Sequence, residues 1–173
     1  QEYEYSLLAK ECGIEMPETF LFDGKYFGVE RFDRSIRGKL HVVSIAGLLC
    51  ADYRIPCIDY LHILQVCAEL THSIAELWKI YRLMVFNYLI GNKDDHAKNF
   101  SFIYRDGDWH FAPAYDILPS NGMNGFHTTS INDSITPTKE DLIAVATKAG
   151  LPSKEAEAIF NQIHTILKSK HQV

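Results

Sequence analysis

The segment from Ile74 to Ile90 carries a long apolar pattern that strongly restricts the fold of this chain. Its apolar residues recur three and four positions apart, the spacing of one face of an α-helix. Phe86 and Ile90 fall off that face, so we expect the helix to be buried on more than one side. Gly91 follows, and glycine commonly ends a helix in a left-handed conformation. The pattern predicts a central helix with neighbours around it.

Further helices are predicted before this segment. Residues 2–12 have apolar side chains close to helical spacing, and Gly13 is a plausible C-cap. The pattern turns helical again from about Ile45, most clearly over 58–68.

Two more helices are predicted near the C-terminus. Thr138 with Asp141 approximates a capping box before residues 142–149. Ser153 is expected to cap a helix from Lys154 to about Leu167. The apolar stripe of this last helix is expected to be Ile159, Ile163 and Ile166.

Two Asp-Gly pairs predict β-hairpins, because this dipeptide favours tight turns between strands. Asp23-Gly24 separates aromatic and branched residues at 18–22 and 26–32. Asp106-Gly107 separates similar runs at 100–104 and 109–111, and residues 120–134 are expected to form a loop. The predicted fold class is α+β and mainly helical, with a small lobe built from the first helix and the first hairpin.

Length and composition restrict the class of protein. The 173 residues are enough for one sizeable core, and the net charge of −5 argues against a broadly basic nucleic-acid-binding face. No apolar run approaches the roughly 20 residues that span a bilayer. There is no signal peptide, and because the chain starts at Gln1 we expect a piece of a longer protein. The four cysteines lack metal-ligand spacing and are expected to be buried thiols in a reducing cytoplasm; they are Cys12, Cys50, Cys57 and Cys67.

The densest polar cluster, Gly91–Ser101, directly follows the central helix. If the second hairpin turns at Asp106-Gly107, the numbers of two residues that face each other across it add up to about 213. This pairing brings Asn99 and Asp116 to the same end of the hairpin. An amide oxygen and a carboxylate are the hard ligands that magnesium prefers, with phosphates and water completing its shell.

Other residues of the cluster suit phosphoryl transfer. A carboxylate at Asp94 can accept the proton of an attacking hydroxyl, and Lys98 is a candidate cation for the phosphates. His96 is expected to donate to a phosphate or to position the loop. The alternative is a hydrophilic turn after a helix, with Lys and His near the negative end of the helix dipole.

These residues resemble the HipA family of bacterial serine/threonine kinases. The family's Asp-x-His-x-Lys-Asn-x-Ser loop is matched from Asp94 to Ser101, and its Tyr-Asp by Tyr115-Asp116. Its Val-Glu-Arg-Phe-Asp-Arg signature is present unbroken as residues 29–34. The opening residues 1–3 and the Gly-Ile-x-x-Pro at 13–17 also look like the family, so the likeness covers most of the chain.

The resemblance implies a protein-kinase-like C-lobe with a partial N-lobe. Residues 1–34 would form the partial N-lobe and hinge, and residues 35–173 the helical lobe with the catalytic loop. It implies Asp94 as proton acceptor, and Asn99 and Asp116 as ligands of Mg2+ against the phosphates of ATP. The implied nucleotide-binding residues are Glu30, Arg31, Phe32, His96, Ala97, Lys98, Asn99, Tyr115 and Asp116.

The implied activity is transfer of the γ-phosphoryl group of ATP to a serine or threonine hydroxyl of a protein, in the cytoplasm. The implied partner is a HipB-like helix-turn-helix antitoxin, with DNA contacted only through it and no membrane involved. By the same resemblance, the region around His127–Ser130 is the activation segment and is expected either to touch substrate or to be a mobile loop.

The chain also departs from the family. The sequence contains no Gly-rich phosphate loop, and Lys10 is a poor substitute for the family's phosphate-contacting lysine. Asp95 stands where glycine is common, and is expected to raise the pKa of Asp94 or to help hold metal; it also competes with Asp94 for the role of base.

Two alternatives remain open. The chain could be a non-catalytic kinase remnant or split-kinase subunit that binds an antitoxin or a partner lobe. It could also be a lipid or small-molecule kinase, because Asp-x-His-x-x-Asn resembles the catalytic loop of phosphatidylinositol kinases; the intact signature at 29–34 argues against that. Trp78, Trp109, His62, His72 and His164 are assigned packing or surface roles.

Overall fold

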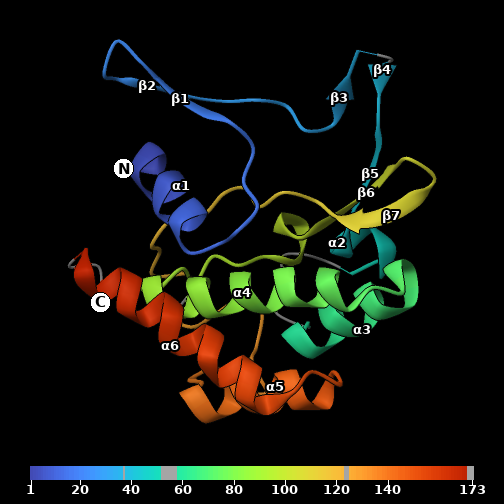
Figure 1. The fold of residues 1–173 in the computed structure, drawn as a ribbon, viewed down its shortest axis with the longest axis vertical. Helices are drawn as coiled ribbons and strands as arrows, with labels where there is room; N and C mark the ends of the chain where they lie inside the picture. The colour runs from blue at the N-terminus through green and yellow to red at the C-terminus, as the bar shows by residue number, and fades with distance from the viewer. Residues whose placement is uncertain (37, 52–57, 123–124, 171–173) are drawn as a thin grey trace.

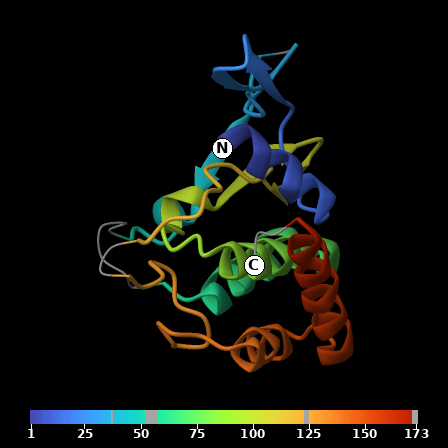
Figure 2. The ribbon, with the colours of Figure 1, turned by 90° about the vertical axis from the view of Figure 1, so that its left-hand side faces the viewer.

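A computed structural model describes residues 1–36, 38–51, 58–122 and 125–170. Four helices gather at one end of the molecule, a three-stranded sheet and the first helix lie above them, and two strand pairs project at the far end (Figures 1 and 2). The predicted mixture of helices and short antiparallel strands is confirmed. None of the described helices is long and apolar enough to cross a membrane.

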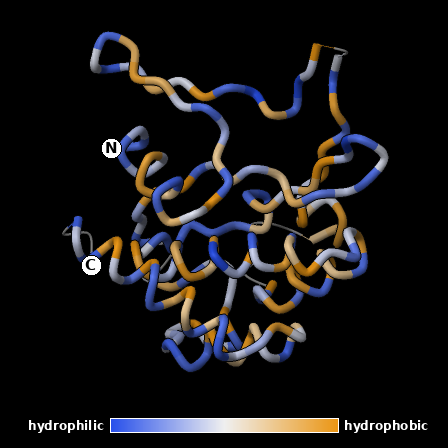
Figure 3. Tube along the Cα trace, in the orientation of Figure 1, coloured by the Kyte–Doolittle hydropathy of each residue, from blue (hydrophilic) through white to orange (hydrophobic). Residues whose placement is uncertain are grey.

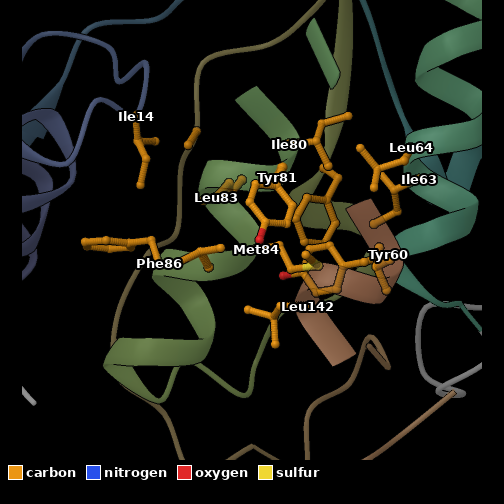
Figure 4. Close-up of a cluster of buried hydrophobic side chains, with 14 of the residues drawn as sticks. Ile14, Tyr60, Ile63, Leu64, Ile80, Tyr81, Leu83, Met84, Phe86 and Leu142 are labelled. Carbon is orange, nitrogen blue, oxygen red and sulfur yellow. The ribbon is translucent and has the colours of Figure 1, made fainter. Parts of the chain in front are cut away.

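Helix α4, Ile74–Ile90, is the centre of the core, as the apolar pattern predicted. It packs against α3, Tyr60–Thr71, and against α6, Ser153–Ser169, while α5, Lys139–Lys148, packs on α6. Burial on more than one side is confirmed, because the successive residues 83–87 are all buried. Figure 4 shows the side chains of α3 and α4 meeting Leu142 of α5 in this core.

Some of the predicted helix ends are correct, whereas α3 runs over Tyr60–Thr71 rather than over 58–68. Gly91 ends α4 with a φ of 69°, and Thr138 and Asp141 form the capping box of α5. The prediction for Ser153 is wrong, because Ser153 is the first helical residue of α6 and Pro152 occupies the N-cap position without a side-chain bond. The buried stripe of α6 also differs from the expected one: it consists of Ala156, Phe160, Ile163 and Leu167, whereas Ile159 and Ile166 are half-buried.

The second predicted hairpin forms with the expected register. Strands β6, Ser101–Arg105, and β7, Asp108–Phe111, pair antiparallel at positions that sum to 213. A third strand, β5 (His41–Ser44), pairs with the other edge of β6 and leads into the short helix α2, Ile45–Leu48. Strand β5 was not predicted, because four residues that run straight into a helix show no recognisable alternation.

Helix α1, Glu2–Glu11, precedes the first predicted hairpin, whose strands are β1, Thr19–Phe22, and β2, Tyr26–Val29. The second strand ends at Val29 rather than at residue 32. Strands β3, Arg34–Ser35, and β4, Gly38–Lys39, form another small pair. Figure 3 shows hydrophobic residues along the β1–β2 hairpin, where six are exposed: Phe20, Leu21, Phe22, Tyr26, Phe27 and Val29.

The cysteine prediction holds only in part. Cys12 and Cys67 are buried free thiols, and burial raises the pKa of Cys12 to about 11 and that of Cys67 to about 12. Cys50 is exposed, which contradicts the expectation. Cys57 lies outside the described residues. The packing role of Trp78 and Trp109 is confirmed, since both lie half-buried against the core.

Candidate functional site

The loop that leaves α4 carries the first half of the candidate site. Gly91 ends the helix in a left-handed conformation, and the loop continues to a single 3-10 turn at Ala97–Asn99. The Asp94 carboxylate is half exposed, and its Oδ1 lies 2.8 Å from Nε2 of His96. His96 therefore positions the Asp94 carboxylate, which supports the loop-positioning alternative for this residue.

Asn99 and Asp116 lie side by side, as the hairpin register predicted. Nδ2 of Asn99 is 3.2 Å from Oδ2 of Asp116 and also donates to the backbone carbonyl of Asp94 at 3.3 Å. One short cluster thus combines the three residues assigned to proton transfer and metal binding.

The route by which Asp116 reaches Asn99 differs from the predicted one. The strand pairing ends at Phe111, and Ala112 donates the last bond of the ladder to the carbonyl of Ser101. Pro113 has no N–H to continue a ladder, and the N–H of Ala114 turns to the carbonyl of Glu15 instead. Asp116 then adopts a left-handed backbone, with a φ of 57°.

Tyr115 joins the two halves of the site. Its hydroxyl donates to the carbonyl of Lys98 at 2.8 Å and lies 2.6 Å from Oγ of Ser101. Its ring stacks on Phe32, with the centroids 5.8 Å apart. Burial of the Tyr115 hydroxyl raises its pKa. The residue before Asp116 is therefore bound both to the loop that leaves α4 and to the segment that follows β2.

The segment 30–34 combines an ion-pair cluster with that stacking contact. Glu30 and Arg31 are exposed, whereas Phe32 is half-buried. Arg31 makes two hydrogen bonds to Asp33, at 2.9 and 2.7 Å, and Arg34 approaches the same carboxylate to 2.6 Å. The hydrogen bonds from Arg31 lower the pKa of Asp33. Of the three predicted hinge residues, Phe32 is the one whose ring packs on the Tyr115-Asp116 segment.

Asp95 has a different place from the one expected. It is 1 % exposed and accepts hydrogen bonds from the hydroxyl of Tyr60, the ring of His127, and the N–H groups of Thr128 and Thr129. A carboxylate saturated by four donors inside the protein is a structural anchor. The expectation that Asp95 helps hold metal is therefore wrong. Because Asp95 is buried whereas the Asp94 carboxylate is half exposed, Asp94 stays the candidate for the role of base.

The same contacts argue against one of the two alternatives for the segment after Asp116, the mobile loop, and leave contact with substrate as a prediction. His127, Thr128 and Thr129 are buried rather than mobile, and Lys93 holds the segment further with its backbone carbonyl and, through Nζ, with the carbonyl of Gly125. The segment is thereby fixed to the start of the loop that leaves α4.

A buried chain of hydrogen-bonded polar side chains behind the loop that leaves α4 was not predicted from the sequence. The amide of Asn87 donates to the hydroxyl of Tyr60 at 3.1 Å and accepts from Asn92 at 3.1 Å, while Oδ1 of Asn92 accepts from the N–H of Asp94. The available signal was Asn87 itself, a polar residue in the most apolar helix of the chain.

The remaining predicted residues, Ala97 and Lys98, lie on the 3-10 turn. Ala97 is buried and supports the 3-10 turn, whereas Lys98 is exposed. Beside Asp116 a cavity of about 210 Å³ opens between α1, β2 and residues 114–118, with Val29 and Ala114 in its wall. This apolar space lies next to the cluster of polar groups.

The donor set fits a magnesium ion better than a softer metal. The described residues contain no group of three His, Cys, Asp or Glu side chains that could hold a metal by themselves. Asn99 and Asp116 offer hard oxygen atoms at an open site, and Mg2+ is commonly held by one or two such protein ligands together with phosphates and water.

Comparisons with known proteins agree with this geometry. The family of HipA-like C-terminal domains matches residues 1–170. A protein of Sinorhizobium fredii named "Putative kinase Y4dM" is 30 % identical over 88 % of this chain and 43 % of its own length. A protein of Haemophilus influenzae named "Putative kinase" is 29 % identical over 68 % of this chain and 40 % of its own length. The chain thus spans less than half the length of these relatives.

Two solved structures share the fold. HipA in the complex of Shewanella oneidensis HipA, HipB and operator DNA superposes with a TM-score of 0.79 at 19 % identity, over 99 % of this chain and 49 % of that one. The proinflammatory kinase CtkA of Helicobacter pylori gives a TM-score of 0.59 at 15 % identity, over 99 % of this chain and 82 % of that one.

Proposed function

Because this chain belongs to the family of HipA-like C-terminal domains, we propose that it carries the catalytic half of an ATP- and Mg2+-dependent serine/threonine protein kinase. The observation that carries the proposal is the cluster of Asp94, Asn99 and Asp116, in which Asn99 contacts both the backbone of Asp94 and the carboxylate of Asp116. A base beside two hard oxygen ligands is the arrangement that phosphoryl transfer requires.

Asp94 is the proton acceptor in this proposal. Its carboxylate is half exposed, so a hydroxyl group can reach it, and His96 fixes its orientation through Nε2. A positioned carboxylate accelerates attack by accepting the hydroxyl proton as the new bond to phosphorus forms.

Asn99 and Asp116 would hold Mg2+, which when bound offsets the negative charge of the phosphates. Lys98 is an exposed cation on the same turn as Asn99, and its side chain would interact with the phosphates of ATP. Phe32 and Tyr115 form a stacked aromatic pair at the edge of the site, where the base of a nucleotide would lie, with Glu30, Arg31 and Ala97 as further nucleotide-binding positions.

We assign residues 1–34 to a partial N-lobe and hinge, and residues 35–173 to a kinase-like C-lobe. The elements that grip the phosphates would lie in the remainder of a longer protein, as the coverage of the relatives suggests. The Shewanella protein of the same fold is complexed with HipB and operator DNA, which supports a HipB-like antitoxin as partner of this chain. DNA would then be contacted through that partner, and a cytoplasmic location follows from this assignment.

The test is a phosphotransfer assay on the full-length protein with labelled ATP, Mg2+ and a generic protein acceptor such as casein. Asp94→Asn and Asp116→Ala should each abolish transfer of label. Asp106→Asn is the matched control, because it removes the same charge at a left-handed turn position that asparagine tolerates. Undiminished transfer by both site variants would refute the assignment.

A second candidate function is a non-catalytic module that binds a partner lobe or an antitoxin. The exposed apolar side chains of the β1–β2 hairpin favour it, because a two-stranded hairpin is marginally stable until another element covers it. A full-length protein that neither transfers nor binds labelled ATP, but still retains a HipB-like partner in a pull-down, would support this function instead.

A further inference from the structure

Tyr60, Asn87, Asn92 and Asp95 form a polar network inside the protein. Its hydrogen bonds lead from the loop that leaves α4 through α4 and α3 and back to the same loop. All four residues are between 0 and 3 % exposed. Buried polar groups cost stability unless each is hydrogen-bonded, and no enclosed side-chain nitrogen or oxygen of the described residues lacks a partner. The proposed function uses none of these four residues.

The hydrogen bonds of the polar network all point in one direction. Nδ2 of Asn92 donates to Oδ1 of Asn87 at 3.1 Å, and Nδ2 of Asn87 donates to the hydroxyl of Tyr60 at 3.1 Å. The hydroxyl of Tyr60 in turn donates to Oδ2 of Asp95 at 3.1 Å. Each side chain therefore donates towards Asp95, and Asp95 is the acceptor at the end of the network.

Tyr60 sets this direction. Its hydroxyl has a single proton, and the Asp95 carboxylate accepts it. Burial and the neighbouring Asp95 raise the pKa of the Tyr60 hydroxyl well above its ordinary value of 10, so the hydroxyl keeps that proton at neutral pH. Because the proton is committed to Asp95, the oxygen of Tyr60 is left as an acceptor for Nδ2 of Asn87. The amide of Asn87 is thereby oriented with its Oδ1 towards Asn92.

The polar network also determines which atom of Asn92 meets the backbone of Asp94. Asn92 uses Nδ2 for Asn87, so its Oδ1 is the atom that accepts the N–H of Asp94, at 3.3 Å. With the amide of Asn92 reversed, an NH2 group would face the N–H of Asp94, and two donors would oppose each other. The orientation of Asn92, and with it the hydrogen bond of the Asp94 backbone, thus depends on the hydroxyl of Tyr60.

The backbone of Asp94 lies between the two ends of the polar network, with Asn92 before it and Asp95 directly after it. Its carbonyl accepts the N–H of His96 at 2.9 Å and Nδ2 of Asn99 at 3.3 Å. The N–H and the carbonyl of Asp94 are therefore both held by groups of the loop, while the Asp94 carboxylate remains half exposed.

We propose that Tyr60 is a positioning residue for phosphotransfer: its hydroxyl orients Asn87 and Asn92, and through them the backbone that carries the Asp94 carboxylate. The catalytic consequence rests on the proposed kinase function. Tyr60 is fully buried and acts on the reacting groups through other residues. Because a small displacement of a catalytic group slows the chemical step strongly, loss of the hydroxyl should lower kcat and leave the KM for ATP unchanged.

Tyr60→Phe is the informative variant, since it removes the hydroxyl and keeps the ring, which packs edge-on against Phe100. Tyr81→Phe is the matched control. Tyr81 is also fully buried, and its hydroxyl donates to the carbonyl of Ala156 on α6 at 3.2 Å. Both variants lose one buried hydroxyl together with its hydrogen bond, so a general loss of stability would affect both.

Two measurements are made on the full-length protein. The first is the exchange rate of the Asp94 amide in D2O, read by 15N NMR without nucleotide. It should rise about fivefold to tenfold in Tyr60→Phe, the factor that corresponds to one hydrogen bond, and should not change in Tyr81→Phe. The second is phosphotransfer from ATP to casein. Tyr60→Phe should lower kcat about tenfold at an unchanged KM for ATP, whereas Tyr81→Phe should change neither.

Asn87→Leu breaks the polar network at another hydrogen bond, and it provides the test if Tyr60→Phe does not fold. It should affect the Asp94 amide and kcat as Tyr60→Phe does. The double variant should lose no more activity than either single variant, because one broken bond already releases Asn92. Additive losses would mean two separate effects and would overturn the inference.

Equal exchange of the Asp94 amide in the wild type and Tyr60→Phe would overturn the inference, as would faster exchange with an unchanged kcat or an equal loss of kcat in Tyr81→Phe. If the wild type transfers no phosphate, the proposed function is refuted, but faster exchange at Asp94 in Tyr60→Phe alone would still support the control of its backbone by Tyr60. Phosphotransfer that is lost in Asp94→Asn and unchanged in Tyr60→Phe would refute the inference and support the proposed function.

Discussion

The hydroxyl of Tyr115 donates a hydrogen bond of 2.8 Å to the backbone carbonyl of Lys98. This bond links the residue before Asp116 to the turn that carries Asn99, 17 positions away from Asp116 in the sequence. The distance between the two proposed metal ligands therefore depends on a side chain that itself touches neither the metal nor the reacting groups.

Tyr115→Phe should loosen this link while it keeps the ring stacked on Phe32. We expect the free energy of unfolding to fall by about 1 kcal/mol, the net contribution of a typical hydrogen bond. Phosphotransfer should fall severalfold, because Asp116 is then held less firmly against Asn99. Chemical denaturation and the labelled-ATP assay measure the two effects. Tyr104→Phe, at an exposed position of β6, should change neither; a loss of similar size there would contradict the assignment.

Replacement of aspartate by asparagine should lower mainly the stability of the fold at Asp95 and mainly the phosphotransfer activity at Asp94. Asp95→Asn places an amide donor among four donors in a buried site, so we expect the free energy of unfolding to fall by about 3 kcal/mol. Asp94 is half exposed, so Asp94→Asn should change stability by less than about 0.5 kcal/mol but abolish phosphotransfer. Urea unfolding of both variants gives the comparison, and equal stabilities would show that the Asp95 network does not anchor the loop.

The second hairpin could be predicted from sequence because its information is local. Asp106-Gly107 fixes the turn, and the turn fixes every pair of the register from Arg105 with Asp108 to Phe102 with Phe111. Extension of this register to residues 97–99 and 114–116 correctly placed Asn99 near Asp116. It was wrong in predicting strand pairing between these residues, because Pro113 interrupts the ladder. Tertiary contacts, including the bond from Ala114 to Glu15, complete the approach.

The role of Asp95 could not be predicted in this way. Its partners lie 32 to 35 positions away, on α3 and on the segment after Asp116, and no periodicity relates them. A carboxylate beside Asp94 looks like a second catalytic acid until burial is known. The capping role of His62 was missed for a related reason, because the sequence pattern of a capping box has glutamate or glutamine at that position.

Glu76 should make the stability of the fold depend on pH. It is 6 % exposed and accepts from the N–H of Phe111 at 2.9 Å and from Lys79 at 2.9 Å, so it ties β7 to the start of α4. Burial acts to raise the pKa of its carboxyl, but the bonds from Lys79 and Phe111 outweigh burial and lower it from the ordinary value of 4.5.

Because the pKa of Glu76 is lower in the native state than in the unfolded chain, its contribution is present above pH 4.5 and is lost as the pH falls through the native value. Glu76→Gln should therefore be less stable than the wild type at neutral pH by about 1 to 3 kcal/mol, and the difference should shrink below pH 4.5. Urea unfolding of both proteins, from neutral pH to below pH 4.5, measures this difference in stability. A constant difference would show that the carboxylate charge does not matter.

Gly122 should tolerate no side chain, because two independent constraints act on it. Its φ is 60°, and an added Cβ would lie 2.6 Å from the carbonyl oxygen of Phe126 and 2.8 Å from that of Lys93. Gly24 has a similar φ of 66° but open space around it. Gly24→Ala should cost about 1 kcal/mol, the strain of a left-handed alanine, whereas Gly122→Ala should cost clearly more and should also weaken phosphotransfer by displacing Lys93 and the loop that follows it. Paired unfolding experiments decide the matter, and equal costs for the two substitutions would mean that the contact between Gly122 and the catalytic loop is not rigid in solution.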